Sequence, residues 1–436
     1  MDRDSALYTL DGRISIAKAL PYGIQHILAM FVANISPVMI ISAACGLASS
    51  DIALMIQTSM LIAGIGTLIQ LFPLWRIGSG LPMVMGISFT FVSIACAVGI
   101  KYGYPAVMGA VLIGGIAEGL LGIFAKHWIR FVTPVCSASV VTAIGFSLLP
   151  AGVQSFGGGA GAEDFGSADN WIMGTVSLAA CIIFTVAAKG RFRQLAVLFG
   201  LVTGYIAALI LGRIDLSPLA QAKLFSLPKF MPFGMEFHAG AILSFILIFM
   251  VSATETIGDA SAIAASGLKR LVTEKENSGA LACNGFVSSL SSLFGCMPIT
   301  SFSQNVGLVA MTGIVNRYVI ATGAGILILA GFIPALGTVL SALPSAVLGG
   351  CTLMMFASIV QSGFTMIFRC GSRGVAVAAL SLSAGFAVTA YPEIFDIFPG
   401  IIRTVFAENI VATVFISALI LDRVLPRGER SVSGSK

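Results

Sequence analysis

Several polar side chains that could bind a small molecule occur within stretches of sequence that are otherwise apolar. Glu255 and Asp259 stand four residues apart in one stretch, so a helix would place them on one face. Gln304 and Asn305 are adjacent in a second stretch, and His26 lies in a third. A carboxylate accepts hydrogen bonds, whereas an amide donates and accepts side by side. Together, Glu255 and Gln304 match a flat heterocycle with neighbouring N–H and C=O groups.

Further residues suit the same kind of ligand. Phe89 could stack on the aromatic face of a heterocycle, and His26 and Asp259 could titrate or complete a network around Glu255, which fits proton coupling. We expect Asn284 and Glu118 to form hydrogen bonds between helices, Glu118 with a neighbouring helix. No Lys or Arg is expected in the middle of an apolar stretch, which disfavours an anionic ligand beside two acids.

The composition places these residues in a membrane. Of the 436 residues, 57% are hydrophobic and 10% are charged, against about 45–50% and about 25% in soluble domains. This excludes an ordinary soluble enzyme, a disordered chain and a nucleic-acid binder. The eight cysteines form no C-x-x-C pair, so we expect buried small hydrophobes and no metal site. Without a catalytic motif, we also expect no enzyme activity and no cofactor.

Fourteen apolar stretches can be followed along the chain, each bounded by polar residues or by Gly and Pro. A bilayer core needs about 20 apolar residues for one helical crossing. The stretches lie at residues 20–46, 52–72, 82–99, 104–125, 131–150, 171–188, 194–212, 239–265, 278–295, 298–315, 318–337, 344–368, 374–390 and 405–422. The third and tenth are too polar for simple spanning helices.

The basic residues favour an even number of crossings with both termini in the cytoplasm. With fourteen crossings, 19 of the 24 Lys and Arg residues lie in cytoplasmic segments, as the positive-inside rule requires. One span more or fewer would exchange the sides of every later loop. We therefore expect a multi-pass protein of the cell membrane, with cytoplasmic tails at 1–19 and 423–436.

Two of the stretches are interrupted by Gly and Pro at corresponding places in the two halves of the chain. Pro82 and Pro298 are 216 residues apart, close to half of 436. Seven spans in each half is an odd number, so the halves must have inverted topology. We predict that spans 3 and 10 each consist of a short strand and a half-helix, whose free N–H groups are suited to ligand binding.

The residues around Gln304 resemble those of a known family. Residues 304–313 (QNVGLVAMTG) match at every specified position the signature [Q/E/P]-N-x-G-x-x-x-x-T-[R/K/G] of the nucleobase–ascorbate transporter family, the uracil and xanthine permeases. Residues 25–26 (QH), 86–89 (GISF) and 255–259 (ETIGD) resemble three further motifs of that family, in the same order. The resemblance therefore covers essentially the whole chain.

The resemblance implies an all-α polytopic membrane protein with 14 transmembrane spans in 7+7 inverted repeats. The substrate-carrying core domain would comprise residues 20–125 and 239–337, and the gate domain residues 131–212 and 344–422. The family also implies homodimers joined through the gate domains, elevator-like movement of the core and proton symport. Sodium is the alternative coupling ion.

The resemblance also implies roles for individual residues. Glu255 and Gln304 would bind the nucleobase, Phe89 would stack on it, and the backbone near Ala33 and Ser303 would contact it. The remaining polar residues would support the site or its coupling to protons: His26, Asp259, Asn305 and Asn284.

The identity of two residues favours an oxidised purine, xanthine or urate, as the substrate. Uracil-type members resemble a pattern with Glu in place of Gln304 and His in place of Asp259. Asn284 is a departure, because purine members commonly carry Asp there and an amide removes an acid from the proton network. A uracil or broad-specificity nucleobase permease is the main alternative. More distant ones are an anion transporter of the same fold, a passive channel and a membrane enzyme.

Overall fold

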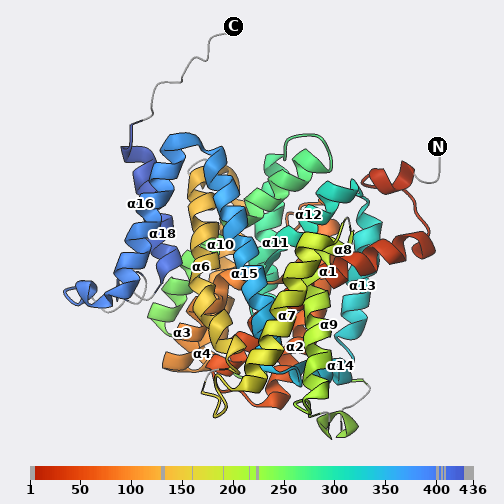
Figure 1. Cartoon of the computed structure of the whole chain (residues 1–436). Helices are drawn as coiled ribbons and strands as arrows, with labels where there is room; N and C mark the ends of the chain where they lie inside the picture. The colour runs from red at the N-terminus through yellow and green to blue at the C-terminus, as the bar shows by residue number, and fades with distance from the viewer. Residues whose placement is uncertain are drawn as a thin grey trace.

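The chain folds into a bundle of long helices with one short pair of strands (Figure 1). The computed structural model describes residues 5–128, 133–159, 161–189, 191–215, 217–221, 225–398, 402–403, 406 and 409–426. Within these residues, eight helices are long and apolar enough to cross a membrane: α1 (Ile16–Ala44), α2 (Ser49–Leu71), α4 (Tyr104–Ile123), α6 (Pro134–Phe156), α7 (Ala168–Ala187), α10 (Ala239–Ser266), α15 (Ser345–Arg369) and α16 (Gly371–Ala390).

Shorter or less apolar helices occupy other predicted stretches. They are α9 (Ala196–Ile210), α11 (Glu274–Leu293), α13 (Arg317–Ala330) and α18 (Ile410–Val424). A capping box between Thr273 and Glu276 begins α11. Single turns form η1 (Ser5–Tyr8), α5 (Ala125–Trp128), α8 (Arg191–Gln194), η4 (Ser217–Gln221) and η5 (Pro392–Phe395). The starts of the predicted stretches 131–150 and 405–422, and residues 1–4 and 427–436 of the predicted tails, lie outside the described residues.

One predicted stretch, 318–337, runs across a sharp bend. Helix α13 ends at Ala330, and α14 (Pro334–Ser341) continues at an angle of 84° to it. Pro334 is at the start of α14, where its missing N–H is not needed and its fixed φ suits a new helix. The helix in this stretch therefore ends earlier than we predicted.

Both interrupted stretches consist of a strand followed by a short helix. β1 (Met85–Ile87) leads through η2 (Phe89–Phe91) into α3 (Val92–Tyr102), and β2 (Ile299–Ser301) leads into α12 (Ser303–Thr312). The strands pair antiparallel, with Gly86 opposite Thr300. Because the two strands run in opposite directions, the short helices leave the pair toward opposite ends of the molecule, α3 below and α12 above in Figure 1.

Two glycines permit this arrangement. A Cβ atom on Gly86 would lie only 2.1 Å from a ring carbon of Phe302. Gly313 ends α12 with a φ of +69°, in the left-handed region that favours glycine. The strand pair therefore has no room for a side chain at Gly86, and α12 ends after ten residues.

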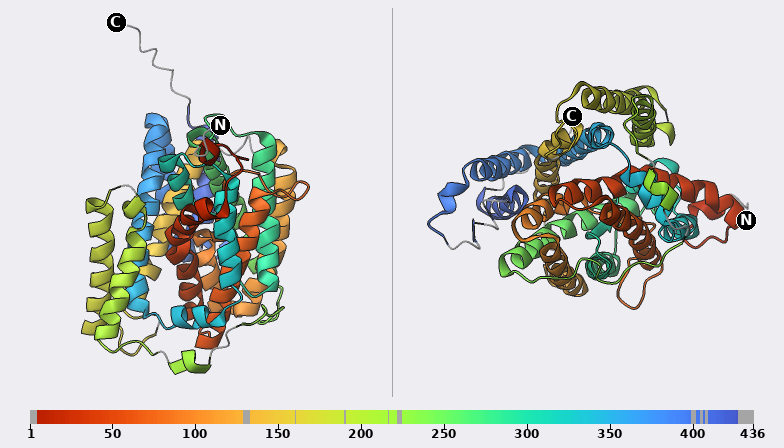
Figure 2. Two further views of the ribbon diagram at one scale, coloured as in Figure 1. Left: turned by 90° about the vertical axis from the view of Figure 1, so that its right-hand side faces the viewer. Right: turned by 90° about the horizontal axis from the view of Figure 1, so that it is seen from below.

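The helices pack in two groups. One group contains α1 to α4, α10, α11 and α13, and the other contains α6, α7, α9, α15, α16 and α18. The two groups meet where α1, α3 and α10 contact α6, α9 and α15. Figure 2 shows, from below, that α7 with α9 and α16 with α18 lie at separate edges of the molecule. The strand pair belongs to the first group, through contacts of β1 with α1 and α2 and of β2 with α10 and α11.

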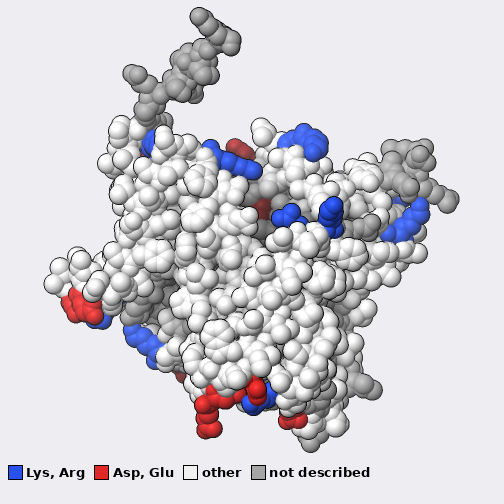
Figure 3. Space-filling view, in the orientation of Figure 1, with Lys and Arg blue, Asp and Glu red and all other residues white. Residues whose placement is uncertain are grey.

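Charged residues avoid the middle of the surface. In Figure 3, Lys, Arg, Asp and Glu lie toward the upper and lower margins and at the left edge, and the broad central area between them is almost uncharged. The exposed side chains include large apolar ones, such as Ile183, Val186 and Ile210. Acidic atoms are visible at the bottom of a hollow in the upper half. A wide uncharged band between charged margins is the surface of a protein that is embedded in a bilayer.

Candidate substrate site at the paired helix breaks

The two acids of α10 each bind the beginning of one short helix. Glu255 accepts a hydrogen bond of 2.6 Å from the hydroxyl of Thr90, in η2. Asp259 accepts one of 2.8 Å from Ser303, the first residue of α12, and one of 2.6 Å from Ser301, in β2. One turn of α10 therefore ties both helix breaks to a single element.

The surroundings of the two carboxyl groups differ. Glu255 is half-buried, whereas Asp259 is buried with 7% of its surface exposed. Within the described residues, neither acid forms an ion pair with Lys or Arg. The free N–H groups and the positive dipole end at the start of α12 favour a negative charge nearby. Asp259 already accepts hydrogen bonds from two hydroxyl groups, whereas Glu255 accepts one. Glu255 can therefore accept more hydrogen bonds from a ligand.

Helix α1 contacts both breaks. Nδ2 of Asn305 donates to the backbone oxygen of His26 at 3.0 Å and lies 3.0 Å from Nδ1 of the same residue. With Nδ1 accepting this second N–H, the neutral imidazole carries its proton on Nε2. At the other break, Oδ1 of Asn34 accepts the N–H of Ile87 at 2.8 Å. The neighbouring Ala33 is buried.

Asn284 joins three elements around β2. Its Nδ2 donates to the hydroxyl of Thr256, in α10, and to that of Thr300, in β2, at 3.1 Å. Its Oδ1 has no hydrogen-bond partner among the described residues. Asn284 thus binds Thr256, which follows Glu255 in α10, and Thr300, which precedes the Asp259 partner Ser301.

Phe89 lies where the two groups of helices meet. Its ring packs edge to face against Phe356 of α15, with 5.4 Å between ring centroids and 87° between ring planes. Only 8% of its surface is exposed. Because the two rings belong to different groups of helices, a relative movement of the groups would separate them.

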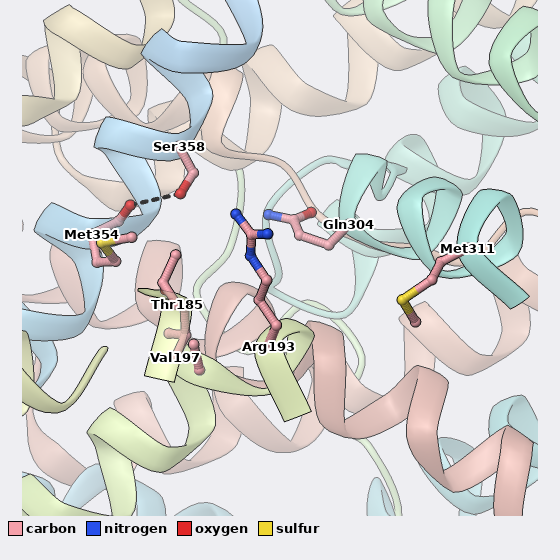
Figure 4. Close-up of a pocket in the computed structure, with 8 residues that line it drawn as sticks. Thr185, Arg193, Val197, Gln304, Met311, Met354 and Ser358 are labelled. Carbon is pink, nitrogen blue, oxygen red and sulfur yellow. Dashed lines mark hydrogen bonds between the residues drawn. The ribbon is translucent and has the colours of Figure 1, made fainter. Parts of the chain in front are cut away.

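A cavity of about 460 Å³ opens beside Gln304. Its walls come from α12 and from the second group of helices: Thr185, Arg193, Ala196, Val197, Gln304, Met311, Met354 and Ser358. Figure 4 shows the guanidinium group of Arg193 and the amide of Gln304 pointing toward one another. Ser303, next to Gln304, is the residue that binds Asp259. The cavity is therefore lined by the residue that follows the Asp259 partner in α12.

A second cavity, of about 800 Å³, lies on the α3 side of the strand pair. It is bounded by residues of α1, α3 and α6, among them Ile40, Ser93, Cys96 and Ser147. The two cavities are thus associated with the two short helices that leave the strand pair in opposite directions. Such an arrangement suits access to one site from either side.

Two pairs of the residues that we predicted for the site are in direct contact, Asp259 with Ser303 and His26 with Asn305, and several other partners were not predicted. Thr90 and Asn34 were missed: Asn34 is an amide within an apolar stretch and could have been found on that basis, whereas Thr90 is one of several hydroxyl residues around the first break. Arg193 was also missed, and no motif marks it. Glu118 differs from our expectation, because neither of its carboxyl oxygens has a hydrogen-bond partner in the described part of the chain. No group of three or more His, Cys, Asp or Glu residues there could hold a metal ion.

Helices long enough to span a membrane, arranged around a polar site at two paired breaks, define an integral membrane transporter. Residues 17–394 match the model of a permease family. The chain belongs to this family, the nucleobase–ascorbate transporters.

Individual proteins agree with this assignment. The chain is 32% identical to the xanthine permease XanQ of Escherichia coli over 97% of this chain and 94% of that protein. It is 33% identical to the uric acid permease PucK of Bacillus subtilis over 89% and 91%. Among solved structures, the transmembrane domain of the cyanobacterial bicarbonate transporter BicA matches with a TM-score of 0.64 and 14% identity, covering 93% of this chain and 99% of that domain. This last likeness concerns the fold alone.

Proposed function

We propose that the protein is a secondary active transporter that takes up an oxidised purine, xanthine or urate, together with a proton. The observation that carries this proposal is the attachment of both helix breaks to the two acids of α10, beside a cavity that exposes Gln304. The relationship to xanthine and uric acid permeases supports the substrate class. As a transporter, the protein would act without an enzymatic reaction or a resident cofactor.

In this proposal, Glu255 and Gln304 hold the edge of the base. The carboxylate accepts N–H groups, and the amide donates to a carbonyl and accepts from its neighbour. Phe89 stacks on the base, and the backbone at Ser303 and Ala33 completes the contacts. The two breaks and α1 are held in position by the hydrogen bonds of four residues: Asp259, His26, Asn305 and Asn284.

Arg193 adds an electrostatic preference to the cavity. Urate is anionic at neutral pH, and a guanidinium group binds planar anions with two parallel hydrogen bonds. Because Arg193 faces Gln304, it would attract an anionic purine toward the site from the α12 side. This observation favours urate and ionised xanthine over uracil, which is neutral at that pH. It also keeps open the more distant alternative of an anion transporter with the same fold.

The architecture that we propose has fourteen spans in two inverted halves. The antiparallel β1–β2 pair and the opposite directions of α3 and α12 support inverted repeats. The first group of helices would be the core domain, at residues 20–125 and 239–337, and the second the gate domain, at 131–212 and 344–422. Since all site acids belong to one group, the core could carry the base past the gate like an elevator.

The orientation and assembly follow from the same proposal. η1 and the end of α18 lie on the same side of the molecule, which an even number of crossings requires (Figure 1). The predominance of basic residues at that margin supports its cytoplasmic location (Figure 3). We propose homodimers that meet through the gate domain, in which α16 and α18 form one edge.

Cells that express the protein are expected to accumulate labelled xanthine against its gradient. A proton ionophore should reduce the final level to equilibration, because it removes the driving force without blocking the site. Uptake would be measured with and without the ionophore, and again in sodium-free medium as a control. Accumulation that resists the ionophore but requires sodium would reassign the coupling ion. Equilibration alone would contradict active transport and indicate a channel.

A further inference from the structure

Glu118 is a buried acid that the site described above does not use. It lies in α4, and only 1% of its surface is exposed. Neither carboxyl oxygen has a hydrogen-bond partner within the described residues. A polar group that is buried without a partner is rare and costly, so a role other than packing is expected.

A close contact between α4 and α11 surrounds Glu118. Gly115, Gly119 and Gly122 bring the two helices so close that a Cβ atom on any of them would lie within 3 Å of the residues of α11. Glu118 is on the same stretch of α4, within this contact. Two titratable groups interact electrostatically with Glu118: Glu255 of α10 and Cys283 of α11. No cation among the described residues pairs with it.

An ionised carboxylate in such a place would lack both a counter-charge and hydrogen-bond donors. Removing a charge from water costs several kcal/mol even after relaxation of the protein. Glu118 is therefore expected to hold a proton in this conformation. With Glu118 neutral, Glu255 can ionise with one negative charge fewer nearby, Asp259 being the other acid that acts on it. An ionised Glu255 is the form that accepts the N–H groups of a base. Proton binding at Glu118 would thus favour substrate binding at Glu255, which is the linkage that symport requires.

We propose that Glu118 is a proton-binding site of the transport cycle, which takes up a proton before the base binds and so promotes binding at Glu255. This inference rests on the proposed function. It gives the chain an acid for coupling in α4, whereas Asn284 of α11 is an amide that takes up no proton. The proton is bound by the carboxylate of Glu118 to form the neutral acid, and its release restores the carboxylate.

The variant Glu118→Gln tests this role, because glutamine has the size and neutrality of the protonated acid but cannot release a proton. In proteoliposomes, xanthine exchange across the membrane without a pH gradient is expected to persist. Accumulation driven by a pH gradient should fall by about tenfold, within the usual range of coupling between two sites. The matched control is Glu163→Gln, in an exposed loop, which should behave like the wild type. Unchanged accumulation, or loss of exchange together with accumulation, would overturn the proposal.

An infrared measurement keeps the test independent of transport and of the folding of one variant. The purified wild-type protein should show the carbonyl band of a protonated carboxylic acid in a dry environment. That band should be lost in Glu118→Gln and kept in Glu255→Gln. Its absence from the wild type would overturn the proposal even if Glu118→Gln fails to fold. A wild type that shows the band but transports no nucleobase would refute the proposed function instead.

Discussion

Replacing Glu255 by glutamine is expected to abolish uptake of xanthine while leaving the protein in the membrane. Glu255 accepts the Thr90 hydroxyl at 2.6 Å and is the acid with capacity left for a ligand. Glutamine retains one acceptor oxygen but replaces the other with a donor, which would face the N–H groups of the base. A hydrogen bond to a charged group contributes about 1.5–3 kcal/mol, so loss of one such bond reduces binding by about 10- to 100-fold. Loss of coupling to Thr90 adds to this effect.

The measurement for Glu255→Gln is initial uptake of labelled xanthine, normalised to the amount of protein in the membrane. Glu163→Gln is again the matched control, because it makes the same chemical change in an exposed loop. Uptake by Glu255→Gln at the wild-type rate would refute the assignment of the site. A variant that is missing from the membrane would instead show that the hydrogen bond to Thr90 is needed for folding, and Glu255→Asp would then be used.

The substitution Gln304→Glu is expected to change which base the protein prefers. The Gln304 side chain is exposed to the cavity. A carboxylate there only accepts hydrogen bonds, so a carbonyl of xanthine would lose its donor and face a negative charge. The new carboxylate would also offset the positive charge of Arg193 across the cavity, which removes the attraction for an anionic purine. Xanthine should compete at least about tenfold less well, and uracil comparatively better.

Competition assays in the variant and the wild type measure this shift. The control is Gln154→Glu, which introduces the same charge at an exposed position beside the other cavity. An unchanged ranking of xanthine and uracil in Gln304→Glu would mean that Gln304 is structural. The base would then have to be held from α10 and the helix breaks alone.

Helix α10 joins the two helix breaks, which neither of its acids could do alone. Glu255 holds η2, and Asp259 holds α12 and β2, so both breaks follow any displacement of α10. His26 and Asn305 add α1 to the same unit. In contrast, Phe89 and Phe356 are in contact across the two groups of helices, and this pair would separate during transport.

The sequence was informative where polar residues interrupt an apolar pattern. The spacing of Glu255 and Asp259, the Gln304-Asn305 pair and the two Gly/Pro breaks all mark elements of the site, because a polar group in an apolar stretch needs a partner. The partners themselves depend on tertiary contacts. Hydroxyls such as those of Thr90 and Ser301 are too common in the chain for their contacts to be predicted.

Other features could not be predicted from local patterns. Arg193 belongs to a short helix between α7 and α9, and it lines the same cavity as Gln304 only because the two groups of helices are adjacent. Glu118 has the sequence environment of an acid that pairs with a neighbouring helix, and its isolation results from the close glycine contact between α4 and α11. The bend after Ala330 lies within an apolar run, so hydropathy does not reveal it.

The most direct test of the central claim is uptake of labelled xanthine by cells that express the wild-type protein, with excess unlabelled urate, hypoxanthine, uracil or sulfate as competitors. We expect xanthine to accumulate, urate to compete, and uracil and sulfate to leave the uptake unchanged. If uracil competes best or xanthine does not enter, the purine assignment is wrong, and Asn284 becomes the first residue to test. Competition by sulfate would contradict nucleobase transport itself and favour an anion carrier of the same fold.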